Sequence, residues 1–375
     1  MLIWGLLFLI APTASSSCGE GGHWTEAETT PRVKASRVSL AVPKGNQVKE
    51  REKQWLESAC PVQTVMHSCH AHGDIDRAKS LERRTWMPVD KTTCAPFSAD
   101  DFMRALQDRR LLFYGDSVMM QLFTAVVCSS STPFSADVDW YKHGSSSQTY
   151  YNDRTCPYGD KHCHLHGASA YFKSYNLTVE FRLFGWYEGL VETGTRFRLL
   201  NAYQKGLLSR LIEKHSLDRD DVLVINWGLH AHSKTDYASR LGDFRKDLDA
   251  LGDQRGPREI LFMETWPQHF FGDGSGSGLY HVDQRDEGDG RCFPIKNSSL
   301  EEADWKNTYA RSALEGQTRA KLIRVAAALR SQHDAHIQAS SKLVKMAQAD
   351  CTHWCFPSGV FSMVLTVLQN ELLPH

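Results

Sequence analysis

The stretch Arg110-Leu111-Leu112-Phe113-Tyr114-Gly115-Asp116-Ser117 decides the fold of this chain. Its apolar run, residues 110–114, is short and bounded by charged and turn residues, which is typical of a buried strand. The apolar segment at residues 118–128 predicts a helix directly after it. Ser117 therefore lies at a strand-to-helix turn, the place where parallel α/β sheets bind their ligands.

Working outward, similar apolar runs predict strands at residues 178–184, 221–227 and 259–265. Further helices are expected at residues 197–215, 236–251, 300–331 and 360–373. This alternation predicts fold class α/β, with a parallel sheet covered by helices on both faces.

The composition narrows the possible partners. The chain has 375 residues, of which 43 are basic and 44 acidic, with 41% hydrophobic residues. That fraction suits a packed core. The even charge balance gives no electrostatic footprint for nucleic acid, so no nucleic-acid partner is expected.

The N-terminus predicts a secretory route. Residues 1–17 combine a short apolar run with small residues, as a signal peptide does. The run is shorter than the roughly 20 residues that span a bilayer. A soluble mature protein is therefore expected, and the alternatives are a membrane-tethering signal anchor or a wrongly assigned start.

Ten cysteines and two Asn-x-Ser/Thr sequons, at Asn176 and Asn297, fit an oxidising compartment. Disulfides are expected, although spacing does not give their pairing. Residues 18–58 are interpreted as a polar linker, residues 59–100 as a small Cys-rich segment, and residues 101–375 as the main domain.

Ser117, His353 and Asp350 are the candidate catalytic residues. A serine hydroxyl needs a base to take its proton, and that base needs a third group to hold its tautomer. Asp350 and His353 are three residues apart, so one turn or helix start can present both. The alternatives are that Ser117 or Asp350 merely caps a helix.

The oxyanion of such a reaction needs hydrogen-bond donors. The candidates are the backbone N–H of Ser117 at a helix start, the side-chain amide of Asn226, and the backbone of Gly185. The alternatives are that Asn226 is a local turn residue and that Gly185 is a glycine required only for packing.

Two clusters contain metal-ligand residue types, but no metal site is expected. Cys351, His353 and Cys355 are interpreted as two disulfide cysteines around the histidine. The second cluster lacks a clean zinc spacing, so a disulfide with exposed histidines is expected there, with zinc as the alternative. Its members are Cys156, His162, Cys163, His164 and His166.

Several blocks resemble the plant trichome-birefringence-like proteins, in the PC-esterase branch of the GDSL/SGNH hydrolase-like superfamily. The similarity runs over most of the chain after Cys60. Asp350-Cys-Thr-His-Trp-Cys-x-Pro357 and Gly115-Asp-Ser-x3-Gln121 carry it most clearly. The other blocks begin at Cys69, Trp86, Tyr175, Asp221, Pro267 and Gly290.

The resemblance implies a three-layer α/β/α sandwich of SGNH type with a Ser-His-Asp triad. It also implies O-acetyl transfer to polysaccharide or glycan hydroxyls in the Golgi lumen. Ser117 would be the nucleophile, His353 the base and Asp350 its orienting acid. No bound cofactor is expected, and a transferase would need an acetyl donor that the sequence does not name.

The chain departs from the family pattern near Met263, where the family has an arginine, and at residues 229–232. Both positions fall where substrate is expected to contact the enzyme. Weak candidates for substrate binding are Trp227, His230, His269 and Trp266. Trp186 and Tyr187 are further candidate rings for stacking on a sugar, although core packing explains the aromatic residues equally well.

Three functions remain open from the sequence. The first is a secretory-pathway O-acetyltransferase, in the Golgi lumen or secreted, that works through an acyl-serine intermediate. The second is a carbohydrate acetyl esterase with the same triad and water as acceptor. The third is a non-catalytic glycan-binding protein.

Overall fold

The described part of the chain covers the sheet, most of its helices and the C-terminal motif. The structure, a computed structural model, describes residues 17–26, 69, 75–89, 94–130, 138–145, 164–183, 203–231, 233–252, 255–272, 275–276, 292–295, 300–337 and 350–373. The expected signal peptide lies outside these residues except for Ser17.

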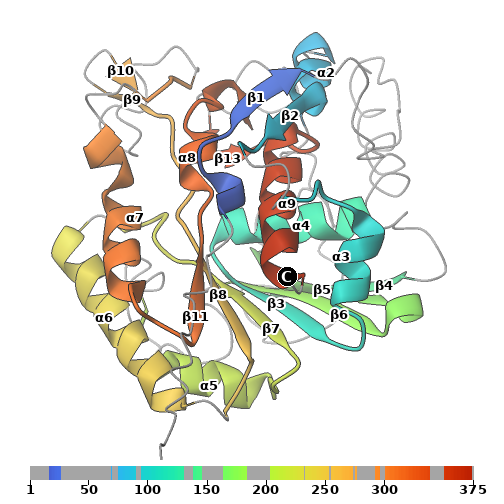
Figure 1. The fold of residues 1–375 in the computed structure, drawn as a ribbon, viewed down its shortest axis with the longest axis vertical. Coiled ribbons are helices and arrows are strands. Elements are labelled where there is room, and N and C mark those ends of the chain that lie inside the picture. The colour runs from blue at the N-terminus through green and yellow to red at the C-terminus, as the bar shows by residue number, and fades with distance from the viewer. Residues whose placement is uncertain are drawn as a thin grey trace, which may run out of the picture.

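A seven-stranded sheet in the order β11-β8-β7-β3-β6-β5-β4 forms the centre of the fold (Figure 1). Its strands are β3 Arg110–Gly115, β4 Val138–Ser145, β5 His164–Phe172, β6 Leu177–Leu183, β7 Val222–Ile225, β8 Glu259–Met263 and β11 Ala320–Ile323. Neighbours from β11 to β6 pair in parallel, while β5 and β4 add an antiparallel edge. The predicted α/β class is confirmed, but the sheet is mixed and not wholly parallel.

Strand β3 is buried on both faces because its side chains alternate between two cores. Leu111 and Phe113 belong to one hydrophobic cluster, and Leu112 and Tyr114 belong to the other. All four side chains are fully buried. A continuous apolar run is what such a two-sided strand requires.

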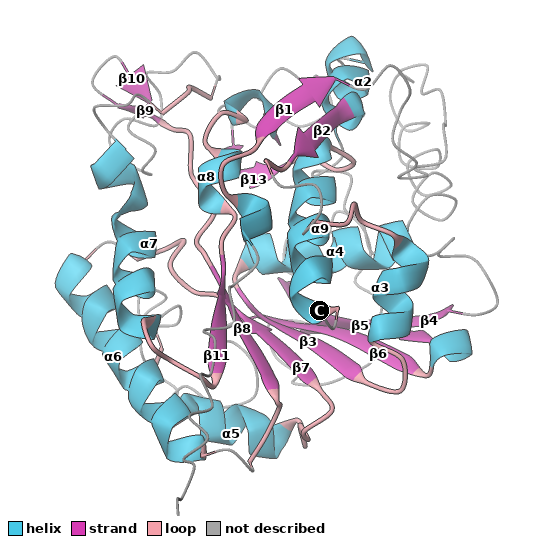
Figure 2. Ribbon diagram, viewed as in Figure 1, coloured by secondary structure: helices cyan, strands magenta, loops and turns pink. Residues whose placement is uncertain are grey.

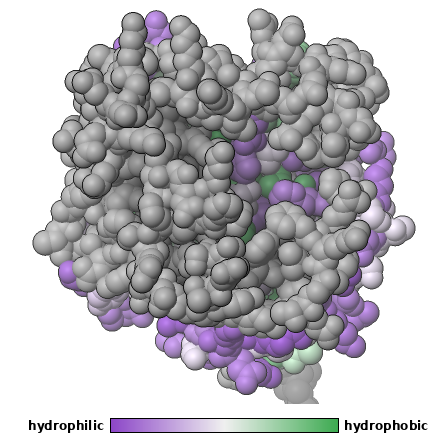
Figure 3. Space-filling view, turned by 180° about the vertical axis from the view of Figure 1, so that it is seen from behind, coloured by the Kyte–Doolittle hydropathy of each residue, from purple (hydrophilic) through white to green (hydrophobic). Residues whose placement is uncertain are grey.

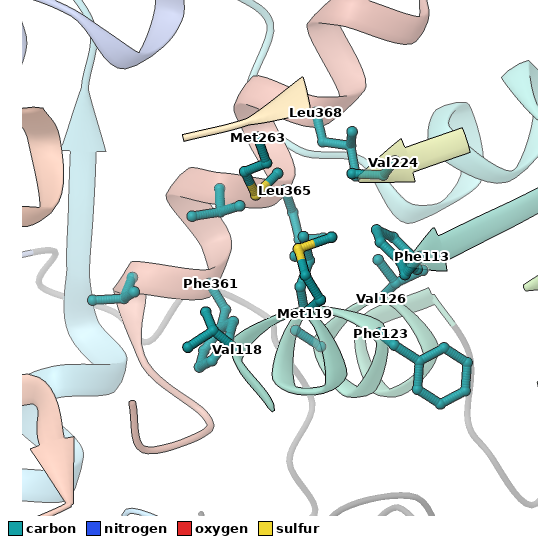
Figure 4. Packing of buried hydrophobic residues seen from close by; sticks show 14 of the residues in the cluster. Phe113, Val118, Met119, Phe123, Val126, Val224, Met263, Phe361, Leu365 and Leu368 are labelled. Carbon is teal, nitrogen blue, oxygen red and sulfur yellow. The ribbon is translucent and has the colours of Figure 1, made fainter. Parts of the chain in front are cut away.

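Helices cover the two faces as the sequence predicts (Figures 1 and 2). One face packs against α3 Ala99–Ala105, α4 Ser117–Ser130 and α9 Gly359–Leu372. The other packs against α5 Leu207–Lys214, α6 Lys234–Leu251 and α7 Leu300–Leu314. In Figure 4, Met119 of α4 lies between α9 and the sheet residue Phe113. The result is a three-layer α/β/α arrangement consistent with an SGNH-like sandwich.

Two expected helices are corrected by the structure. Residues 300–331 do not form one helix but α7, the edge strand β11 and α8 Ala326–Leu329. Gly316, with φ of 69°, follows the end of α7 and reverses the chain toward β11. In the expected helix 197–215, α5 begins only at Leu207, because Gly206 has φ of 78°; residues 197–202 lie outside the described part.

The antiparallel strands β4 and β5 were not predicted. Gly167 interrupts the apolar pattern of β5, yet it sits in the ladder opposite Arg182 of β6. A Cβ at Gly167 would lie 2.7 Å from the carbonyl oxygen of Phe181, so only glycine fits this close strand approach. Pairing with β6, and not an apolar run of its own, defines this strand.

Residues 17–26 correct the expected linker of residues 18–58. They form η1 Ser17–Gly19 and β1 His23–Glu26, and β1 pairs with β2 Arg84–Met87. The Trp24 indole donates a hydrogen bond of 2.8 Å to the carbonyl of Ala328. A disulfide joins Cys18 to Cys94. These contacts fix the start of the expected linker on the main domain.

The remaining short elements lie mostly near the C-terminal motif. They are α2 Ile75–Arg83, η4 Lys173–Tyr175, β9 Phe271–Gly272, β10 Ser275–Gly276, η8 His333–Ala335, β12 His336–Ile337 and β13 Asp350–Trp354. Among the described helices, none has the length and hydrophobicity required to cross a membrane. Seen from behind, the described residues along the lower rim are mostly hydrophilic (Figure 3).

Candidate active site

Asp350 and His353 lie on β13, in a bulge that turns both side chains to the same side. His336 of β12 pairs with Trp354 of β13, and the next residue, Ile337, pairs with Asp350. One step along β12 therefore corresponds to four along β13. In a regular strand, residues three apart point to opposite faces. The bulge removes this restriction. Asp350 Oδ1 stabilises it by accepting hydrogen bonds of 3.1 Å from the backbone N–H groups of Thr352 and His353.

Ser117, His353 and Asp350 are joined by two short hydrogen-bonding contacts. His353 Nε2 lies 2.6 Å from Ser117 Oγ, and His353 Nδ1 lies 2.6 Å from Asp350 Oδ2. The His353 and Asp350 side chains are 23% and 15% exposed, so substrate can reach the edge of the cluster. This is the geometry in which a histidine takes a proton from a serine while a carboxylate holds its tautomer.

Asp116, and not Ser117, caps helix α4. Asp116 Oδ1 accepts a hydrogen bond of 3.0 Å from the Val118 backbone, and the Asp116 carbonyl accepts one of 3.2 Å from Met120 N–H. Asp116, the residue before Ser117, is therefore the N-cap of α4. The Ser117 hydroxyl is left to face His353, and the Ser117 N–H lies at the positive end of the helix dipole.

Gln121 and two disulfides hold the strand that carries His353. The Gln121 amide donates to the Trp354 carbonyl at 2.6 Å and accepts from the Trp354 N–H at 3.1 Å. Disulfides Cys292–Cys351 and Cys69–Cys355 bracket His353 two residues away on each side. The expected disulfide state of Cys351 and Cys355 is confirmed.

The carboxylate and the imidazole shift each other's pKa. Burial alone raises the pKa of Asp350, but the charge and hydrogen bonds of His353 outweigh it and hold the pKa well below 3.8. Burial alone lowers the pKa of His353, but the Asp350 carboxylate outweighs it and raises the pKa above 6.5. The aspartate thus stabilises the protonated form of the imidazole.

Asp116 is a second buried carboxyl next to this pair. Burial raises its pKa, while His230 and His353 pull it the other way. His230 is exposed. Lys306 on α7 is buried, donates to the Leu229 carbonyl at 3.1 Å, and has its pKa lowered by burial to about 8. Buried ionisable groups of both signs, Asp116 and Lys306, therefore lie near the cluster.

Asn226 lies at the end of β7, beside the Gly-Asp-Ser turn. Its side-chain N–H donates to the Met263 carbonyl at 2.7 Å, and its backbone N–H bonds to Tyr114. A Cβ on Gly115 would come within 2.9 Å of the Asn226 carbonyl oxygen and 2.3 Å of Met119. Glycine at 115 therefore lets the two strand ends approach. Gly185, the third oxyanion candidate, lies outside the described residues.

Three weak candidates for substrate binding are corrected by their burial. Trp227, Trp266 and His269 are at most 3% exposed, so they present no ring face to a sugar. Trp227 stacks on Tyr203 with ring centroids 4.8 Å apart, inside the core. His230 alone of the four is exposed. Trp186 and Tyr187 lie outside the described residues.

Metal ligation is not evident in the described part of the chain, where no group of three or more His, Cys, Asp or Glu side chains has suitable geometry. His353 is committed to Ser117 and Asp350, and its cysteine neighbours are in disulfides. The cluster between Cys156 and His166 falls outside the described residues, apart from the backbone of His164 and His166.

Sequence reasoning assigned no role to three polar residues that support the cluster. Besides Gln121, Gln268 Nε2 donates to Thr352 Oγ1 at 2.9 Å, and His336 Nδ1 contacts the His353 carbonyl at 3.0 Å. Gln121 follows Ser117 by one helical turn, a spacing that indicates a shared helix face. No sequence pattern indicates the other two, because their partners are distant in the chain.

The fold and the cluster together define an α/β/α protein with a serine–histidine–aspartate arrangement at the carboxyl end of its central strand. The chain is 23% identical over 361 residues to probable xylan O-acetyltransferase 10 of Oryza sativa subsp. japonica, covering 86% of this chain and 74% of that protein. It is 32% identical over 96 residues to probable xylan O-acetyltransferase 11 of the same organism, 24% of each chain.

No protein-family model matches the chain. The similarity over most of its length nevertheless supports a relationship to the family that the sequence motifs resemble. The disulfides agree with the oxidising compartment expected from the cysteine content.

Proposed function

We propose that this protein is a polysaccharide O-acetyltransferase that works through an acetyl-Ser117 intermediate. The observation that carries the proposal is the contact chain from Asp350 through His353 to Ser117, with 2.6 Å at each step. The names of the two relatives support acetyl transfer to a polysaccharide, with xylan as the first acceptor to test.

In the first half-reaction, Ser117 Oγ attacks the carbonyl carbon of an acetyl donor and its proton passes to His353 Nε2. The bond from the acetyl carbon to the donor's leaving group breaks, and the leaving group takes that proton. Asp350 stays ionised and holds the Nδ1–H throughout. The products are acetyl-Ser117 and the deacylated donor.

In the second half-reaction, a sugar hydroxyl gives its proton to His353 Nε2 and attacks the acetyl carbon. The Ser117 ester bond breaks, and Ser117 Oγ recovers the proton. The oxyanion in each half is assigned to the Ser117 N–H and to the second N–H of the Asn226 amide, the first being bonded to Met263. Removing such a donor typically costs about 10²–10³ in kcat, which is the expectation for Asn226→Ala.

The test is incubation of the purified protein with an activated acetyl ester, with and without xylo-oligosaccharides. Wild type, Ser117→Ala, and Ser312→Ala on the exposed face of α7 are compared. The proposal expects acetylated oligosaccharide and an acetylated Ser117 peptide, both lost in Ser117→Ala and retained in Ser312→Ala.

Other outcomes separate the rival functions. Free acetate without sugar product, dependent on Ser117, identifies an esterase. Transfer that survives Ser117→Ala removes the acyl-serine mechanism. Oligosaccharide binding without turnover, unchanged in Ser117→Ala, identifies a glycan-binding protein.

A further inference from the structure

Behind His353 lies a pair of buried histidines that the mechanism above does not use. His269 follows β8 and His336 begins β12, and both side chains are 0% exposed. His269 Nδ1 lies 2.7 Å from His336 Nε2. The outer nitrogens face backbone carbonyl oxygens: His269 Nε2 lies 2.8 Å from that of Arg330, and His336 Nδ1 lies 3.0 Å from that of His353.

These three contacts fix the number of protons. A carbonyl oxygen only accepts, so each outer ring nitrogen must carry a proton. The contact between the two inner nitrogens requires one more. Two neutral imidazoles carry only two protons, and any placement of two brings a nitrogen lone pair against another lone pair within 3.0 Å. Only three protons satisfy every contact, which gives the pair one positive charge.

We propose that His269 and His336 share three protons and a single positive charge, and that the pair is a positioning device for His353. His336 Nδ1–H donates to the His353 carbonyl and thereby holds the bulge of β13 that presents His353 to Ser117. The role in positioning rests on the proposed function, whereas the proton count stands independently of it.

The surroundings act on this charge in both directions. Burial opposes it and pushes the pKa of each ring, taken singly, below 6.5. Trp354 favours it, because its ring lies over His336 with centroids 4.0 Å apart. The other charged or titratable groups that face the pair come from α2, η8 and β13: Arg77, His333, Asp334, Asp350 and His353.

Of those groups, the two carboxylates favour the charge, while protonated His333, protonated His353 and Arg77 oppose it. The three hydrogen bonds stabilise the charge against burial and the nearby positive groups, because a charged donor forms bonds roughly twice as strong as a neutral one. Loss of the third proton at higher pH therefore breaks one of the three contacts. The pair titrates as a unit and not as two independent rings.

The first test counts protons by NMR of protein labelled with ¹⁵N-histidine, at about pH 6. The proposal expects both outer nitrogens, His269 Nε2 and His336 Nδ1, to be protonated. It also expects one strongly downfield proton resonance from the contact between the two inner nitrogens. That resonance disappears in His269→Gln and in His336→Gln and persists in the neighbouring His333→Asn. Two neutral rings at this pH, or no shared proton, would overturn the proposal.

The second test uses the two amides that mimic one ring nitrogen each. In His336→Asn the amide replaces Nδ1 and still donates to the His353 carbonyl, whereas in His336→Gln it replaces Nε2 and reaches only His269. We expect His336→Gln to lower kcat about tenfold with KM unchanged, and His336→Asn to recover most of it. Equal losses that follow stability alone contradict positioning.

The two proposals fail separately. If Ser117→Ala retains transfer, the kcat comparison loses its meaning while the NMR result still decides the proton count.

Discussion

The side chain of Gln121 binds both the N–H and the carbonyl of Trp354, although the two residues are 233 positions apart. These two hydrogen bonds fix the position of the helix that begins with Ser117 relative to the strand that carries His353. Helix α4 and strand β13 are thereby coupled one turn away from the serine–histidine contact.

Replacing Gln121 with leucine should uncouple them. Two buried main-chain groups lose their partner, which costs about 1–3 kcal/mol of unfolding free energy, and kcat should fall at least about tenfold as Ser117 and His353 separate. Urea unfolding and steady-state kinetics measure the two effects. Gln107→Leu, at an exposed position, should change stability by no more than about 0.5 kcal/mol and leave kcat unchanged.

Asp350→Asn should destabilise the protein in a pH-dependent way. Asparagine keeps the Oδ1 acceptor for the backbone of the bulge, but its NH2 group replaces Oδ2, so the change removes both the charge and the acceptor for His353 Nδ1–H. The folded pKa of Asp350 is depressed, so its contribution is present above 3.8 and lost as pH falls through the folded value. The folded pKa of His353 is raised, so its contribution is present below 6.5 and lost as pH rises through the folded value.

The stability gap between wild type and Asp350→Asn is therefore largest between these limits. Urea unfolding at about pH 5 should give a larger gap than at about pH 9. A gap of the same size at both pH values would show that the two side chains do not form an ion pair.

The two disulfides Cys292–Cys351 and Cys18–Cys94 should differ in function but not in stability. Their sequence separations, 59 and 76 residues, are similar, so replacing either pair by alanine should cost about 2–5 kcal/mol. Only the first adjoins His353, so only its loss should lower kcat in protein that is still folded. Equal kinetic losses in the two variants would contradict a positioning role for Cys351.

Gly115→Ala should destabilise the fold by about 1–3 kcal/mol, because the added methyl group meets Met119 at 2.3 Å and the Asn226 carbonyl at 2.9 Å. Gly242→Ala is the matched control. Gly242 lies inside α6 with open space around it, so alanine should stabilise the protein by about 0.5–1 kcal/mol. Thermal or urea unfolding of the two variants should give shifts of opposite sign.

The parallel strands were predictable because each carries its own apolar run. Runs at residues 110–114, 178–184, 221–227 and 259–265 lie within one or two residues of β3, β6, β7 and β8. Edge strand β11 was not predictable, because it is short and its two buried residues, Ala320 and Ile323, are three positions apart, a spacing that also fits a helix. Strand β5 depends on its pairing with β6 and has no strong signal of its own.

The sequence by itself determined the α/β alternation, the strand-to-helix turn at Ser117 and the pair Asp350 and His353 as candidates. These follow from local periodicity and from residue chemistry. Only the tertiary structure decided which groups meet. These are the bulge that turns Asp350 toward His353, the two hydrogen bonds between Gln121 and Trp354, and the pair of His269 and His336 behind β13. Each depends on backbone groups far apart in the chain, whose hydrogen bonds form only when the sheet and helices pack, so no local pattern encodes them.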